Sequence, residues 1–258
     1  MSSIDIFNEV LPEFDKKEVL PEINADEFCK VVESRRSVRV YTEEQIPEAI
    51  VRKCLHLALL APNSSNLQPW QFYWVRDPEK KTKLIKYCLS QPSARTSAEL
   101  IVAVARPDTW EGVRKQMMEV INKKDPAKVK AVRQYYERIV PLAYNQGPLG
   151  IYGPIKKLLL FFRGLKTPTP RGPSSISEML IWAHKNTALA CENLMLAFRA
   201  HGYDSCPMEG MDPVRIKKLL NLPSEADICM VISAGKRAPN GVYGNRIRFD
   251  ENQFIKVI

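Results

Sequence analysis

The chain has 258 residues, of which 45% are hydrophobic and 26% are charged, and its formal net charge is +9. This length suits one large domain or two small ones, and the composition is that of an ordinary globular protein. The purely apolar runs are short, such as "LLLFF" at Leu158–Phe162, which argues against a membrane span. The N-terminus lacks the basic-then-apolar layout of a signal peptide, so we expect a cytoplasmic protein.

The first half of the chain is predicted to combine helices with buried strands. Pro12 and Pro21 oppose a long helix, so residues 1–24 are expected to form an extended N-terminal arm. Asp26 is the expected N-cap of the first helix. The predicted elements are helices over 25–36 and 47–60, a strand over 70–75, a helix over 78–89 and a strand over 100–106.

The second half is predicted to be built around one long helix. Residues 108–140 are expected to be mostly helical, and residues 141–174 are rich in proline and glycine. The helix over 174–202 is apolar around most of its circumference, so we expect it at the centre of a domain or of a dimer. A helix over 213–221, a strand over 227–235 and a strand-like C-terminal run complete one α+β domain with few strands.

The positive charge admits two explanations, a nucleic-acid partner or a small anionic ligand together with solubility. No RNA- or DNA-binding motif accompanies the basic residues, so we predict the small ligand and no nucleic acid. The six scattered cysteines are expected to be reduced thiols, and the three histidines lack the spacing of metal ligands. Glycine motifs for dinucleotides or triphosphates and the serine-hydrolase elbow are absent from the sequence.

A first polar cluster lies in "SRRSVR", at the expected end of the first helix. Alternate residues of an extended chain point the same way, so Arg35, Ser37 and Arg39 could face one anion. Arginine forks suit phosphate oxygens. A solvated basic helix end explains the same spacing equally well.

A second cluster is "APNSSNLQPWQF", residues 61–72, between an expected helix and an expected strand. Its side chains supply neutral donors and acceptors of the kind that match the edge of a heterocycle. They belong to Asn63, Ser64, Ser65, Asn66 and Gln68. An ordinary turn needs fewer such residues, so the stretch favours a ligand edge.

A third cluster is "CPMEGMDP", residues 206–213, which is expected to form a rigid loop that presents its backbone to a ligand. Near the C-terminus, "GNRIRF" adds Arg246 and Arg248. Two arginine pairs at opposite ends of the chain suggest one phosphate held from two sides, by one chain or by two subunits.

Residues 26–252 resemble the nitroreductase family of FMN-dependent oxidoreductases, because "RRSVRVY", "APNSSNLQPWQF", "PMEG" and "NRIRF" occur in its order and spacing. The resemblance implies an α+β fold with a central, mainly antiparallel sheet flanked by helices. It also implies an intertwined homodimer with FMN at the interface. The helix over 174–202 resembles the family's dimer-interface helix, and residues 246–258 resemble an extension that adds to the partner's sheet.

At the phosphate end of the flavin, the resemblance implies contacts from both ends of the chain. The residues are Arg35, Arg36, Ser37, Arg39, Arg246 and Arg248. Arg35 and Arg39 would contact phosphate or ribityl oxygens, and Ser37 would approach the phosphate or the pyrimidine.

At the ring end, the resemblance implies two segments and one glutamine. These are Pro62, Asn63, Ser64 and Asn66 from the partner subunit, Gln91 at the pyrimidine edge, and Pro207, Met208, Glu209 and Gly210 against the central ring. A backbone N–H of the last segment would donate to flavin N5, so Glu209 would matter by its position more than by its carboxylate.

The implied reaction is ping-pong transfer of hydride from NAD(P)H, through flavin N5, to an electron-poor acceptor such as a nitroaromatic or a quinone. Nearby arginines would stabilise the anionic reduced flavin, and no acid–base dyad is required. Alternatives on the same fold are reductive dehalogenation, flavin fragmentation by oxygen, and a flavin-binding dimer without turnover. NADH and NADPH both remain open as donors.

Residues 141–174 depart from the family's usual pattern. They are interpreted as a lid that selects the acceptor, as a basic amphipathic contact with a membrane surface, or as a helical excursion packed on the dimer. Membrane contact is the least favoured of the three.

Overall fold

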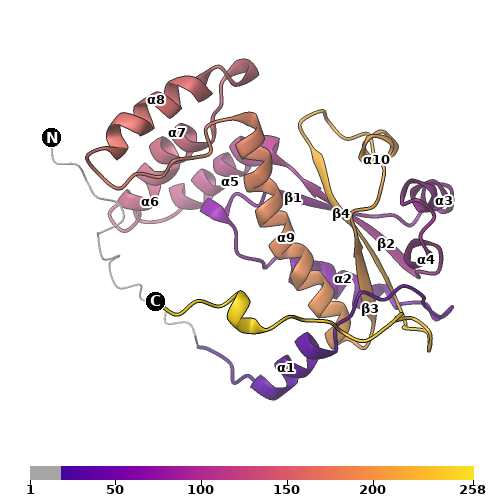
Figure 1. Ribbon diagram of the computed structural model, residues 1–258. Helices are drawn as coiled ribbons and strands as arrows, with labels where there is room; N and C mark the ends of the chain where they lie inside the picture. Colours follow the sequence, from indigo (N-terminus) through magenta and orange to yellow (C-terminus); the bar gives the residue numbers. More distant parts are fainter. Residues whose placement is uncertain (1–18) are drawn as a thin grey trace.

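A four-stranded antiparallel sheet organises residues 19–258, which are the residues that the computed structural model describes (Figure 1). The strand order is β1-β2-β4-β3. The strands are β1 (Trp70–Trp74), β2 (Glu99–Ala105), β3 (Asp204–Met208) and β4 (Asp227–Gly235). The antiparallel α+β architecture confirms the predicted fold class.

Helices occupy both faces of this sheet and extend beyond one end of it. They are α1 (Ala25–Ser34), α2 (Glu48–Ala58), α3 (Pro78–Tyr87), α4 (Pro92–Arg95), α5 (Trp110–Asn122), α6 (Lys130–Gln134), α7 (Val140–Tyr144), α8 (Tyr152–Gly164), α9 (Ile176–Ala200) and α10 (Pro213–Leu219). A π-helical turn at Tyr135–Ile139 joins α6 to α7, and short 3₁₀ turns lie at Ser64–Asn66, Pro107–Thr109, Pro148–Gly150 and Glu251–Gln253.

Strand β2 is buried on both faces, which explains its nearly continuous apolar sequence. Ile101 and Ala103 pack in the core formed with α2 and α9, whereas Leu100, Val102 and Val104 pack in the core formed with α3 and α10. Full burial of one such branched side chain contributes roughly 1.5–3 kcal/mol. The sheet is therefore the middle layer between two helical layers.

Helix α9 is the central helix that the apolar sequence predicted. The Ser175 side chain caps it by accepting a hydrogen bond from the Glu178 backbone N–H at 3.2 Å. Eleven of its residues are buried, among them Leu194 and Phe198 in the core above the sheet. Its N-terminal half contributes Trp182 to a separate core with residues of α5 and α7.

Helices α5 to α8 form a helical lobe beside the N-terminal half of α9 (Figure 1). This lobe includes the stretch 141–174, whose proline- and glycine-rich sequence contains the 13-residue helix α8. Among residues 19–258, no helix is both long and apolar enough to cross a bilayer. The six cysteines, all within these residues, are free thiols.

Two local predictions were wrong, and a third, a C-terminal strand that adds to a partner's sheet, stays a prediction. The N-cap of α1 is Asn24, whose Oδ1 accepts from the backbone N–H groups of Asp26 and Glu27 at 3.0 and 3.3 Å, while Asp26 lies in the first turn. Cys206–Met208 lie in β3 and not in a loop. Pro207 is tolerated there because β3 is an edge strand, so the missing N–H of Pro207 removes no hydrogen bond to β4. The C-terminal run forms no strand within residues 19–258, since no neighbouring strand of this chain pairs with it.

The predicted N-terminal arm lies mostly outside the described residues. Residues 1–18 are not described, and residues 19–24 have no regular secondary structure.

Candidate functional site

A hollow of about 220 Å³ lies where the end of α1 meets the C-terminal segment. Its lining consists of Arg35, Arg36, Ser37, Asn245, Arg246, Ile247 and Arg248. The Arg36 guanidinium donates to the Gly244 carbonyl at 2.6 Å, and the Arg246 guanidinium donates to the Arg35 carbonyl. The structure therefore brings Arg35 and Arg36 together with Arg246 and Arg248, and we call these four residues the arginine cluster. Arg39, the third member of the predicted alternating set, does not line the hollow.

The chain leaving α1 is extended, as predicted, and runs along the edge strand β3. Ser37 forms a parallel bridge with Ser205, and the Val38 N–H donates to the Ser205 carbonyl at 3.1 Å. The Arg39 N–H donates to the carbonyl of Gly241 at 2.7 Å. These backbone bonds fix the start of the arginine cluster against the sheet and against the segment that leads to Arg246.

A buried ionic network that sequence reasoning missed holds the end of α1 in place. Asp204, only 3% exposed, accepts from Arg199 at 3.3 Å and from Arg237 at 2.5 and 3.1 Å. The same two arginines donate to Ser34, Arg199 to its hydroxyl at 2.8 Å and Arg237 to its carbonyl at 3.2 Å. Because Ser34 immediately precedes Arg35, the network positions the arginine cluster, although the residues of the network do not line the hollow.

The arginine cluster carries excess positive charge. Among the described residues, Arg35 alone of the four has an ion pair, a 3.8 Å contact with Glu192. Desolvation, followed by the charges of Arg248, Arg35 and Arg36, lowers the pKa of Arg246. A neighbouring anion relieves such repulsion, and guanidinium forks match phosphate oxygens. The buried hydroxyl of Ser205, the bridge partner of Ser37, also has no hydrogen-bond partner within residues 19–258. These features fit the phosphate of a mononucleotide.

The loop after β3 is joined to Gln91, which precedes α4. The Gln91 amide donates to the Gly210 carbonyl at 2.7 Å and to the Cys88 carbonyl at 3.1 Å. A Cβ on Gly210 would lie 3.2 Å from the Gln91 nitrogen, so the contact is close. Met208 is buried in the core, whereas Glu209 and Gly210 are exposed. The backbone of Glu209 and Gly210 is therefore free to meet a ligand, while the Met208 side chain is not.

The predicted segment 62–66 does not line the arginine hollow of its own chain. The Ser64 N–H donates to Asn186 of α9 at 2.8 Å, and the Ser65 hydroxyl contacts the Tyr135 and Tyr144 hydroxyls at 2.6 and 3.2 Å. The Asn63 side chain accepts from the Gln68 N–H at 2.8 Å. Asn63, Ser64 and Ser65 therefore stabilise the turn itself and attach it to the helical lobe and to α9.

That turn has an unusual backbone. Ser65, Asn66 and Gln68 have positive φ angles of 57°, 47° and 45°, a region that favours glycine and is tolerated by asparagine. The hydrogen bonds to the helical lobe and to α9 hold this conformation, so the segment is a fixed surface feature of the chain.

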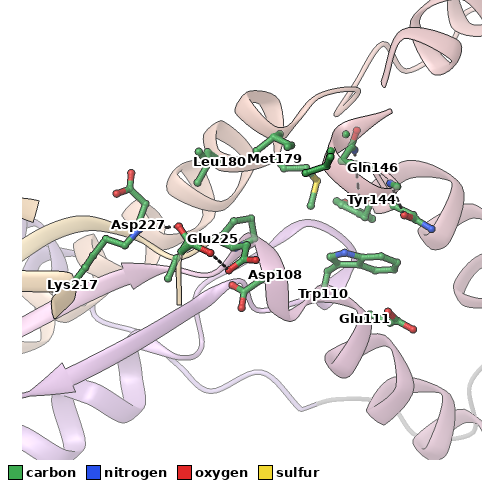
Figure 2. Close-up of a pocket in the computed structure, with 18 residues that line it drawn as sticks. Asp108, Trp110, Glu111, Tyr144, Gln146, Met179, Leu180, Lys217, Glu225 and Asp227 are labelled. Carbon is green, nitrogen blue, oxygen red and sulfur yellow. Dashed lines mark hydrogen bonds between the residues drawn. The ribbon is translucent and has the colours of Figure 1, made fainter. Parts of the chain in front are cut away.

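A larger cavity, of about 670 Å³, lies between the helical lobe and the end of the sheet (Figure 2). Figure 2 shows Trp110 and Tyr144 on one side of it and Asp108, Glu225 and Asp227 on the other. Asp108 pairs with Arg106 at 2.6 Å and Asp227 with His184 at 3.0 Å. None of the predicted site residues lines this cavity, and its carboxylates disfavour a phosphate.

Comparisons with known proteins identify the family of the chain. The model of the nitroreductase family matches residues 32–236. A protein named NADH dehydrogenase from Thermus thermophilus is 27% identical over 213 residues, which cover 83% of this chain and 88% of that protein. YdgI of Bacillus subtilis, named as an NAD(P)H nitroreductase, is 26% identical over 230 residues, covering 88% and 97% of the two chains.

A solved structure from Exiguobacterium sibiricum, named as a nitroreductase in complex with FMN, has the same fold. It aligns with a TM-score of 0.63 at 22% identity, covering 90% of this chain and 97% of that chain. The family match spans most of this chain and includes the end of α1, the turn at 62–66 and the loop after β3. The chain therefore belongs to the nitroreductase family.

Proposed function

We propose that the protein is an FMN-dependent oxidoreductase that passes hydride from NAD(P)H to an electron-poor small molecule, such as a nitroaromatic or a quinone. The observation that carries the proposal is the arginine cluster, which joins both ends of the chain beside β3. Among residues 19–258, the four arginines of the cluster share a single ion pair, the 3.8 Å contact of Arg35 with Glu192. Membership of the nitroreductase family and the FMN complex of a structural neighbour support the same cofactor.

Each part of the site then has a separate task. Arg35, Arg36, Arg246 and Arg248 would hold the phosphate of FMN, and Asp204 would position them through Ser34. Gln91 keeps the Glu209–Gly210 backbone in place, where its N–H groups would meet the flavin ring. Bound FMN would supply the hydride chemistry, so the protein needs to bind, orient and exclude water and needs no acid–base dyad.

We also propose that two chains complete each site. The segment 62–66 lies against the helical lobe and not at the arginine cluster of its own chain, so it is available to a partner's flavin. The C-terminal segment bears Phe249, Phe254, Ile255 and Val257 with exposures between 61% and 96%. Such apolar side chains favour burial against a second subunit.

Two measurements on purified protein test this function. When FMN is titrated into the protein, the fluorescence of the flavin should be quenched on binding. The complex should remain yellow after desalting. The complex should then oxidise NADH or NADPH with menadione or a nitrofuran, and comparing the two nucleotides identifies the donor. A protein that stays colourless with excess FMN would overturn the proposal, whereas tight FMN binding without turnover would retain the cofactor and overturn the enzymatic part.

A further inference from the structure

Helix α8 is packed onto the protein through a narrow seam. The positions of Gly153, Lys156, Leu160 and Gly164, spaced three or four apart, are the ones in α8 that are not exposed. A Cβ on Gly153 would clash with the Ser174 carbonyl, and one on Gly164 would clash with the Arg171 guanidinium. The Lys156 ammonium donates to the carbonyls of Ala143, at 3.1 Å, and Asn145. This seam fixes which side of α8 faces the protein.

The large apolar side chains of α8 consequently point away from the protein. Six side chains, five on α8 and one on its C-cap residue, are each between 54% and 67% exposed and form what we call the α8 apolar face: Ile155, Leu158, Leu159, Phe161, Phe162 and Leu165. Figure 1 shows α8 at the outer edge of the helical lobe, away from the sheet. A contiguous apolar surface of this kind marks a contact with another molecule or with a membrane.

The surroundings of the α8 apolar face are basic. Residues 138–177 contain six lysines and arginines and no aspartate or glutamate. Two of the six, Lys156 and Arg171, donate to backbone carbonyls, and Lys157 lies 3.7 Å from Glu178. Arg163 and Lys166 remain exposed next to Phe162 and Leu165. Apolar side chains and uncompensated cations thus meet at one end of α8.

We propose that α8 docks the protein on an anionic lipid surface, with the α8 apolar face in the interfacial region and Arg163 and Lys166 among the lipid phosphates. A helix of 13 residues is too short to span a bilayer, which takes about 20 residues, so the contact is peripheral. A lid would have to turn the apolar side inward, and the glycine seam opposes that rotation.

Charge also argues against a second copy of the chain as the occupant. Pairing two α8 apolar faces would bring the exposed Arg163 and Lys166 of both copies together, and segment 138–177 holds no acidic residue to compensate them. Anionic headgroups supply the missing negative charge without any specific geometry. The sequence alone places membrane contact last among the roles of 141–174, and the outward orientation of the apolar residues is what favours it.

The experiment is flotation of the purified full-length protein with vesicles of phosphatidylcholine, with and without phosphatidylglycerol. We expect binding to be at least about tenfold stronger with phosphatidylglycerol and to weaken at high salt. The pair Phe161→Ser and Phe162→Ser should lower binding at least about tenfold, because it removes two buried aromatic rings from the interface. The pair Arg163→Gln and Lys166→Gln should remove most of the preference for phosphatidylglycerol.

Matched controls lie on other helices. Lys80→Gln with Lys83→Gln removes two exposed cations from α3, and Val214→Ser removes an exposed apolar side chain from α10. Both should leave vesicle binding within about twofold of the wild type. Circular dichroism and retained FMN binding would show that each variant is folded.

Three results would overturn the proposal. The first is a wild-type protein that does not float with phosphatidylglycerol vesicles. The second is a Phe161→Ser and Phe162→Ser variant that is folded and binds the vesicles as the wild type does. The third is a change of molar mass by light scattering in that variant, which would show that another copy of the chain covers the α8 apolar face.

Discussion

The arginine cluster and the segment around helix α8 are two basic regions of this chain, and their charge is arranged differently. The cluster joins segments from opposite ends of the chain, and hydrogen bonds such as Arg36 to Gly244 fix its geometry. The charge around α8 comes from one continuous segment beside a broad apolar face. A fixed fork suits a single phosphate group, whereas diffuse charge with apolar side chains suits a lipid surface. The two basic regions therefore suit different kinds of ligand.

The largest effect that separates the two regions is expected from Arg248→Glu. The change removes a charge-assisted contact from the cluster and places a negative charge where the phosphate would bind, so the FMN dissociation constant should rise roughly 100-fold or more. Fluorescence titration measures it. Lys80→Glu, the same charge reversal on α3, is the control and should change FMN affinity less than about twofold.

Asp204→Asn tests whether the buried network supports the cluster. It leaves Arg199 and Arg237 without their buried counter-charge, although both arginines are partly exposed and their repulsion is screened. We expect the free energy of unfolding to fall by about 2–3 kcal/mol in urea titrations, and FMN affinity to fall with it. Glu27→Gln, which removes an exposed partner of Lys30, should cost less than about 0.5 kcal/mol. An equal loss in the two variants would contradict the positioning role.

Gln91→Ala should have a smaller effect, at the ring end of the site. The substitution removes the 2.7 Å hydrogen bond to the Gly210 carbonyl, which is worth about 1 kcal/mol, so we expect kcat/KM to fall about fivefold. Steady-state kinetics with a saturating acceptor measures it. Gln45→Ala, an exposed glutamine bonded only locally to Glu43, is the control. A variant with unchanged kcat/KM would show that the loop does not depend on Gln91.

The smallest effect on FMN affinity is expected from Lys166→Gln, outside the arginine cluster. Lys166→Gln should weaken binding to phosphatidylglycerol vesicles about fivefold and leave FMN affinity within about twofold, because it lies on the α8 segment and outside the arginine hollow. A matching loss in both assays would mean that the two basic regions are coupled.

Sequence patterns predicted the elements whose local and tertiary preferences agree. The apolar run of β2 is buried on both faces, and the apolar circumference of α9 faces two cores. The arginine pairs were also found from their residue types, and the structure joins them through backbone carbonyls. The roles of these arginines and of the segment 62–66 at a flavin remain predictions.

The features that sequence reasoning missed depend on contacts between distant segments. Strand β3 was hidden by Pro207, which is tolerated only because β3 lies at the edge of the sheet. Asp204 has no local signature, since its partners Arg199 and Arg237 lie on other elements. The orientation of α8 could not be predicted either, because Gly153 and Gly164 decide which side packs through close contacts with Ser174 and Arg171, which lie outside the helix.

The central claim is that the arginine cluster binds the phosphate of a flavin mononucleotide. Comparing FMN with riboflavin, which lacks the phosphate, tests it most directly by fluorescence titration of the wild type and of Arg248→Glu. We expect the wild type to bind FMN at least about 100-fold more tightly than riboflavin, and the variant to lose most of that difference. Equal affinities for the two flavins in the wild-type protein would contradict the account.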